Sequence, residues 1–231
     1  MGGHYCWRGG LITIPALLLS GMPAEIAIAT NKLQGSAGTA FSSWYFIKKK
    51  IVSIQKIKKI IFMTFIGSIF GSWFLLNINS EILSSFLPYI LIAIGLYFLI
   101  SPSINNEENK RKKQLGLFTF VIAPFLGFYD GFFGPGTGSL MALSCILFYG
   151  KNISSATAHA KILNFTSNFS ALLYFIFFGH ILWSIGLVMM MGQTIGAFLG
   201  AQTVLKSGNK IIRPIIVLVC FLIAIKLILN N

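Results

Sequence analysis

The stretch ATNKLQGSAGTAFSSWYFI at residues 29–47 returns in outline as AHAKILNFTSNFSALLYFI at residues 158–176. Both stretches are apolar and carry one lysine, and these lysines, Lys32 and Lys161, are 129 positions apart (161 − 32 = 129). An offset held without gaps over so long a stretch indicates a duplicated unit. Other pairs related by the same offset are Gly9 and Gly138, Leu11 and Leu140, Gly21 and Gly150, Ile66 and Ile195, Gly67 and Gly196, and Gly71 and Gly200.

The composition is that of an integral membrane protein. The chain is 55% hydrophobic and 10% charged, with a mean hydropathy of +0.80, which is more apolar side chain than a water-soluble domain of 231 residues can enclose. Apolar stretches long enough to span a bilayer lie at about 60–77, 82–101, 115–133, 153–178, 184–204 and 211–229. Two shorter ones, 10–20 and 137–149, precede the lysine segments and fit short or re-entrant helices better.

The net charge of +13 reflects orientation in the membrane, because the basic residues cluster in three loops. Basic loops remain on the cytoplasmic side, so these clusters predict the topology and argue against a nucleic-acid partner. The loops at 77–81 and 179–183 carry no Lys or Arg and are expected outside. The clusters are Lys48, Lys49, Lys50, Lys56, Lys58 and Lys59; Lys110, Arg111, Lys112 and Lys113; and Lys206, Lys210 and Arg213.

The charge map predicts that the two copies are inverted. The loop after the lysine segment is basic in the first copy and bare in the second, and the following loop shows the reverse. We therefore expect an all-α, polytopic bundle of two inverted repeats with short broken or re-entrant helices. Residues 1–103 would form the first repeat, 104–113 a cytoplasmic linker and 114–231 the second repeat, within one membrane domain and with a periplasmic C-terminus.

A glycine-rich break follows the span at 115–133. Gly134, Pro135, Gly136 and Gly138 cannot continue a helix comfortably, so the backbone should open and a short helix should restart at about 137. A helix that restarts within a membrane directs free N–H groups at the space before it, which favours an anion. The alternative is that the glycines only permit tight helix packing, as we expect for Gly67-x-x-x-Gly71.

Polar side chains accompany the two lysines. Lys161, Asn164 and Asn168 have helical spacing and share one face, while His159 and Thr166 share another. Their counterparts in the first copy are Asn31, Lys32 and Gln34.

Ionisable groups inside a membrane usually line a pathway, although the alternative for a lysine is snorkelling to the interface. Asp130 is the one acidic residue in a predicted span, and it would either pair with a lysine or carry a proton. His159 could equally be a hydrogen-bonded core residue.

These motifs resemble a known family. The chain carries two pairs of motifs that look like those of the TauE/SafE family of membrane transporters, and most of all its YfcA-like branch. The first pair is GGLITIPALL at 9–18 with ATNKLQGS at 29–36, and the second is GFYDGFFGPGTGS at 127–139 with ATAHAKILNFTSN at 156–168. The resemblance covers essentially the whole chain. It implies a multi-pass protein of the bacterial inner membrane that exports or imports sulfite, sulfonates or related organic anions.

The N-terminus departs from that pattern. The second copy has a helix at 115–133, whereas its counterpart in the first copy would lie upstream of Met1, and residues 4–8 replace a run of small residues. We expect a missed start, a frameshift or a decaying gene. The functional prediction is a secondary transporter for a small anion that works by alternating access, with no cofactor and with membrane lipid around it.

The alternative is a non-transporting or degenerate member of the same family, and homo-oligomerisation stays open. An enzyme is disfavoured because the spans hold almost no converging catalytic side chains. No catalytic residue or metal ligand is predicted.

Overall fold

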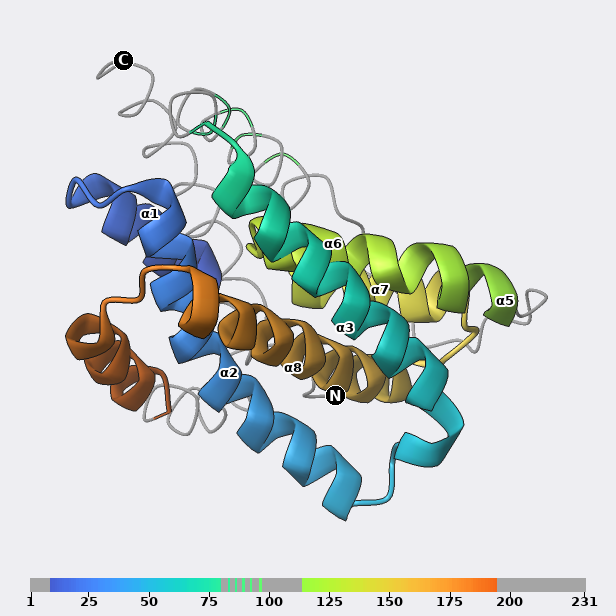
Figure 1. Cartoon of the computed structure of the whole chain (residues 1–231). Helices are drawn as coiled ribbons and strands as arrows, with labels where there is room; N and C mark the ends of the chain where they lie inside the picture. The colour runs from blue at the N-terminus through green and yellow to red at the C-terminus, as the bar shows by residue number, and fades with distance from the viewer. Residues whose placement is uncertain are drawn as a thin grey trace.

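A computed structural model (Figure 1) describes residues 9–79 and 114–194, with single positions at 83, 86, 89, 92 and 96 between them. Every regular element in these ranges is helical, as the sequence predicts. The predicted spans 82–101 and 211–229, the end of the span at 184–204, the linker and residues 1–8 lie outside the described ranges. The helices are α1 (Gly9–Leu19), α2 (Ala24–Lys48), α3 (Ile54–Asn77), α5 (Leu115–Leu117), η1 (Phe118–Ile122), α6 (Ala123–Phe132), α7 (Thr137–Leu147), α8 (Ile153–Phe178) and an unlabelled helix at 183–194.

Two helix starts repeat with the same offset as the sequence. α2 begins at Ala24 and α8 at Ile153, and α3 begins at Ile54 while the next helix of the second copy begins at 183; both shifts are 129 residues (153 − 24 and 183 − 54). The short helices α1 and α7 stand before the two lysine helices, as expected for the stretches at 10–20 and 137–149. These helix starts therefore follow the offset seen in the residues.

The two lysine helices, α2 and α8, pack against each other near the centre of the described bundle. Figure 1 shows them running in opposite directions, α2 from upper left to lower right and α8 back again. Gly35 of α2 permits close packing here, because a Cβ at that position would lie 3.0 Å from Asn168 Oδ1 of α8. The Ser43 hydroxyl of α2 also donates to Lys161 O of α8 at 3.0 Å, which joins the two lysine helices.

A second contact joins α3 to α6 through four glycines. A Cβ placed on Gly67 would lie 2.1 Å from Pro124 O, and one on Gly71 would lie 2.1 Å from Phe128 O. The reciprocal contacts are just as close, with 2.3 Å from Gly127 to Thr64 O and 2.1 Å from Gly131 to Ser68 O. The expectation of a packing role for the first glycine pair is confirmed, and the partner pair on α6 had not been anticipated.

Three helices in the described ranges are long and apolar enough to cross a membrane: Ile54–Asn77, Leu115–Phe132 and Ser154–Phe178. Large apolar side chains cover their outer surface, with Phe125 at 68% and Phe177 at 75% exposed. Such a surface would be unfavourable in water, and it suits contact with lipid chains.

A π turn interrupts the predicted span at 115–133. Residues Phe118–Ile122 form η1, and the Ala123 N–H donates to Phe118 O, five positions back. Pro124 follows directly and has no N–H for the ordinary helical ladder, which is one physical reason for the wider turn. At the base of this helix the Gln114 N–H donates to Phe148 O at 3.0 Å, which joins its start to the end of α7.

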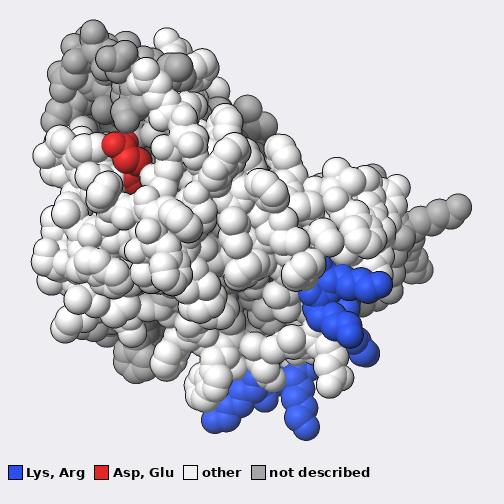
Figure 2. All heavy atoms as spheres, viewed as in Figure 1, with Lys and Arg blue, Asp and Glu red and all other residues white. Residues whose placement is uncertain are grey.

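Positive charge gathers at one end of the described bundle. Figure 2 shows lysine side chains along the bottom and lower right of the molecule, whereas acidic atoms appear at the upper left. The lower right end is where α2 stops and α3 begins (Figure 1). The exposed basic residues there are Lys48, Lys49, Lys50, Lys56, Lys58 and Lys59.

Candidate functional site

The predicted break in the second copy is present. α6 ends at Phe132, Gly134 and Gly136 take left-handed φ angles of 93° and 81°, and α7 begins at Thr137. The Tyr129 hydroxyl donates to Pro135 O at 2.7 Å, and the Thr137 hydroxyl donates to Gly134 O at 2.7 Å. The glycines open the chain, and these two hydroxyls hold it in one conformation.

Lys32 reaches this break from the other repeat. Its ammonium lies 3.0 Å from Asp130 Oδ1 and also donates to the backbone carbonyl of Asp130. Lys32 is 0% and Asp130 1% exposed. Of the two predicted roles for Asp130, the structure contains the ion pair, and it also rules out a Lys32 side chain that snorkels to the interface.

Two serines extend the ion pair to further helices. The Ser167 hydroxyl on α8 donates to Asp130 Oδ2, and the Ser68 hydroxyl on α3 donates to Ser167 O at 2.6 Å. Asp130 therefore accepts hydrogen bonds from α2 and α8 at once, and Ser68 adds α3 to the network. This network joins α2, α3 and α8 to the carboxylate at the end of α6.

The left-handed glycine beside the ammonium provides a testable contact. A Cβ on Gly134 would lie 2.8 Å from Lys32 Nζ, whereas a Cβ on Gly21, which has a similar φ of 83°, would meet nothing within 4 Å. We expect Gly21→Ala to reduce the free energy of unfolding by about 1–2 kcal/mol. Gly134→Ala should reduce it by at least twice that amount, because the new Cβ also meets the Lys32 ammonium. Thermal unfolding of both variants in detergent measures the difference, and equal losses would show that the ammonium moves aside freely.

The first turn of α7 is the predicted anion-binding element. The N–H groups of Thr137, Ser139 and Leu140 donate to the carbonyls of Gly134 and Gly136 at 3.0 to 3.3 Å. The amide of Gly138 has no such turn acceptor within the described part of the chain. Fewer free amides face the break than the sequence pattern indicates, and anion binding there stays a prediction.

The polar face of α8 is buried as predicted. Lys161, Asn164 and Asn168 are 2%, 8% and 6% exposed. Asn168 Nδ2 donates to Asn164 Oδ1 at 2.6 Å, and a Cβ on Gly35 of α2 would lie 3.0 Å from Asn168 Oδ1. The asparagine pair therefore stands at the contact between the two lysine helices.

The polar residues of the first copy divide into two groups. Asn31 accepts a hydrogen bond at 2.6 Å from the hydroxyl of Thr13 on α1, which fixes its side chain. Gln34 is 4% exposed, and its Oε1 has no hydrogen-bond donor among the described residues. An orphaned buried acceptor is costly, so Gln34 has capacity left for a ligand or water.

His159 and Thr166 have local partners. The Nδ1 atom of His159 lies 2.7 Å from Ser155 O one turn back, and the centroids of its ring and the Tyr149 ring lie 5.2 Å apart in a T-shaped arrangement. The Thr166 hydroxyl donates to Ile162 O at 2.9 Å in its own helix. These contacts match the alternative of a core histidine, and a role for either residue in substrate binding stays a prediction.

Sequence reasoning missed the serines. Ser68, Ser72 and Ser167 are all 0% exposed, and Ser72 donates to Gly131 O at 3.3 Å. Small hydroxyl residues in an apolar helix are easily taken for packing alone. A usable pattern was present, because Thr64, Ser68 and Ser72 recur every four residues beside the glycines of α3.

Comparison with known proteins points to one family. Residues 9–227 match the family described as sulfite exporter TauE/SafE. A "Probable membrane transporter protein" of Haemophilus influenzae is 46% identical over 223 residues, covering 96% of this chain and 88% of the relative. The "Probable membrane transporter protein YfcA" of Escherichia coli strain K12 is 45% identical, over 96% of this chain and 83% of the relative. The "Probable membrane transporter protein YunE" of Bacillus subtilis is 25% identical, over 95% of this chain and 89% of the relative. No solved structure matches the chain significantly.

Proposed function

Because the chain belongs to the sulfite exporter TauE/SafE family of membrane transporters, we propose that it carries a small oxyanion, such as sulfite or a sulfonate, across the bacterial inner membrane. The observation that carries this proposal is the burial of Lys32 and Lys161, one on each of two equivalent helices that pack together. Cationic side chains are costly in this environment, and an anionic cargo is one reason to retain both.

The geometry of the ion pair suggests how an anion could bind. The Lys32 ammonium is paired with the Asp130 carboxylate. In this proposal, an arriving oxyanion replaces that carboxylate as the partner of the ammonium. Gln34 and the asparagine pair of α8 are further buried polar groups on the two helices. The Gly138 amide at the start of α7 is the backbone donor best suited to an oxyanion oxygen.

Alternating access is the mechanism that the repeat supports. α2 and α8 run in opposite directions (Figure 1), as two inverted copies require. Tilting one copy against the other would open the region between the lysine helices to each side in turn. The end with the exposed lysines is cytoplasmic in this scheme, and the C-terminus is periplasmic.

The test is flux in membrane vesicles. We expect Lys161→Ala to reduce uptake or efflux of radiolabelled sulfite and small sulfonates by at least about tenfold, because a charge-assisted contact with the anion is lost. Lys56→Ala, which removes an exposed lysine at the basic end, is the matched control and should transport normally.

Two outcomes would count against the proposal. Unchanged flux in both Lys161→Ala and Lys32→Ala would show that the lysine pair is not the anion site. A wild-type protein that is folded and moves no anion from a broad panel would instead favour a non-transporting member of the family.

A further inference from the structure

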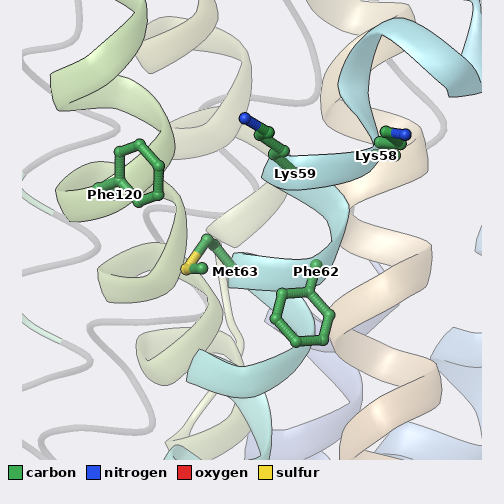
Figure 3. Close-up of a pocket in the computed structure, with 5 residues that line it drawn as sticks. All are labelled: Lys58, Lys59, Phe62, Met63 and Phe120. Atoms are coloured by element: carbon green, nitrogen blue, oxygen red, sulfur yellow. The ribbon is translucent and has the colours of Figure 1, made fainter.

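A surface groove of about 440 Å³ lies between α3 and η1, on the outside of the bundle and away from the buried lysines. Four side chains of α3, namely Lys58, Lys59, Phe62 and Met63, line it together with Phe120 of η1. Figure 3 shows Phe120 on one wall, with Met63 and Lys59 facing it from the other. The groove is therefore bounded by two cations at one end and by apolar side chains along its length.

The order of these side chains along the helix follows the order of groups in a phospholipid. Lys58 and Phe62 are four residues apart, as are Lys59 and Met63, so each lysine lies one turn, about 6 Å, beyond an apolar neighbour. The lysines lie toward the basic end of the bundle, and Phe62 and Phe120, which are 57% and 59% exposed, lie deeper. A charged headgroup followed by an acyl chain fits this arrangement.

The charge of the groove selects the type of lipid. The acidic residues of the described ranges are Glu25 and Asp130; the first lies in the opening turn of α2, about 35 Å along that helix from Lys48, and the second is buried. Consequently no described carboxylate neutralises Lys58 or Lys59. Two ammonium groups that no carboxylate of the described ranges neutralises favour an anionic headgroup over a zwitterionic one.

The backbone adds a second indication. Phe120 stands in the π turn of η1, and such turns occur often at functional sites. We propose that this groove binds one anionic phospholipid, with its phosphate at Lys58 and Lys59 and an acyl chain along Phe62, Met63 and Phe120. This proposal is independent of the transported substrate.

Native mass spectrometry of the intact protein in detergent tests the site. The probes are phosphatidylglycerol and phosphatidylethanolamine with identical acyl chains, each titrated against wild type and variants. We expect tighter binding of phosphatidylglycerol, and its affinity should fall about thirtyfold in the double variant Lys58→Gln with Lys59→Gln. The matched control, Lys49→Gln with Lys56→Gln, removes two exposed lysines that do not line the groove and should bind normally.

A variant of the apolar wall completes the test. Phe120→Ala keeps both charges and alters an exposed side chain, and we expect about tenfold weaker lipid binding. Equal loss in the two lysine double variants would overturn the proposal in favour of diffuse surface charge. Unchanged binding in Phe120→Ala would overturn it as well, because the groove would then hold no acyl chain.

Discussion

Replacing Lys32 by methionine is expected to reduce the free energy of unfolding by about 3–5 kcal/mol, because Asp130 would remain buried without its cation. For a chain of this size, that loss lowers the midpoint of thermal unfolding by about 6–20 °C. Lys56→Met, at an exposed position, should change the free energy by less than about 0.5 kcal/mol. Tryptophan fluorescence during heating in detergent measures the unfolding midpoints of the wild type, Lys32→Met and Lys56→Met.

The double variant separates stability from transport. Lys32→Met with Asp130→Asn removes both charges while leaving a group that can accept the Ser167 hydroxyl, so most of the lost stability should return. If Lys32 also binds the transported anion, this stable protein should still be inactive in the flux assay. A double variant that transports normally would show that the pair only holds the helices together.

The glycine contact between α3 and α6 carries the second large effect. Gly71→Ala would place a Cβ 2.1 Å from Phe128 O, and Gly131→Ala would place one 2.1 Å from Ser68 O. Each substitution forces the two helix backbones apart, and we expect a loss of about 2–3 kcal/mol in the free energy of unfolding.

Gly116→Ala is the matched control for this contact, because a Cβ at that helical position meets nothing within 4 Å. It should be neutral, or stabilising by up to about 1 kcal/mol, since alanine has the higher helix propensity. Thermal unfolding of Gly71→Ala, Gly131→Ala and Gly116→Ala measures whether the loss of stability is confined to the two contact positions. A tolerated alanine at position 71 would mean that the helices separate at little cost.

The two lysines show how far sequence reasoning extends. Their position eight residues into α2 and α8, and their burial, follow from apolar helical sequence on both sides of each lysine. The partner of Lys32 does not follow, because Asp130 is 98 positions away in the other repeat. The offset that relates the copies places no carboxylate in an equivalent position, so the repeat alone could not have identified the pair.

The π turn and the small residues of α3 were harder to predict. Pro124 is visible in the sequence, but a proline can bend, break or widen a helix, and the neighbouring helix decides which. Ser68 gains its role only because Gly131 lets α6 approach closely enough to bring Asp130 and Ser167 to the same place. Such contacts depend on the separation of two backbones, which local sequence does not specify.

The sequence by itself determined the membrane class, the duplication and the break at Gly134 and Gly136. Each of these depends on local chemistry: apolar length, residue identity at a fixed offset, and the φ angles that glycine permits. Only the tertiary structure decided that Lys32 of one copy meets Asp130 of the other, with Ser167 as the third member. Burial makes each charge seek a partner, but helix packing across the repeats decides which partner lies within reach.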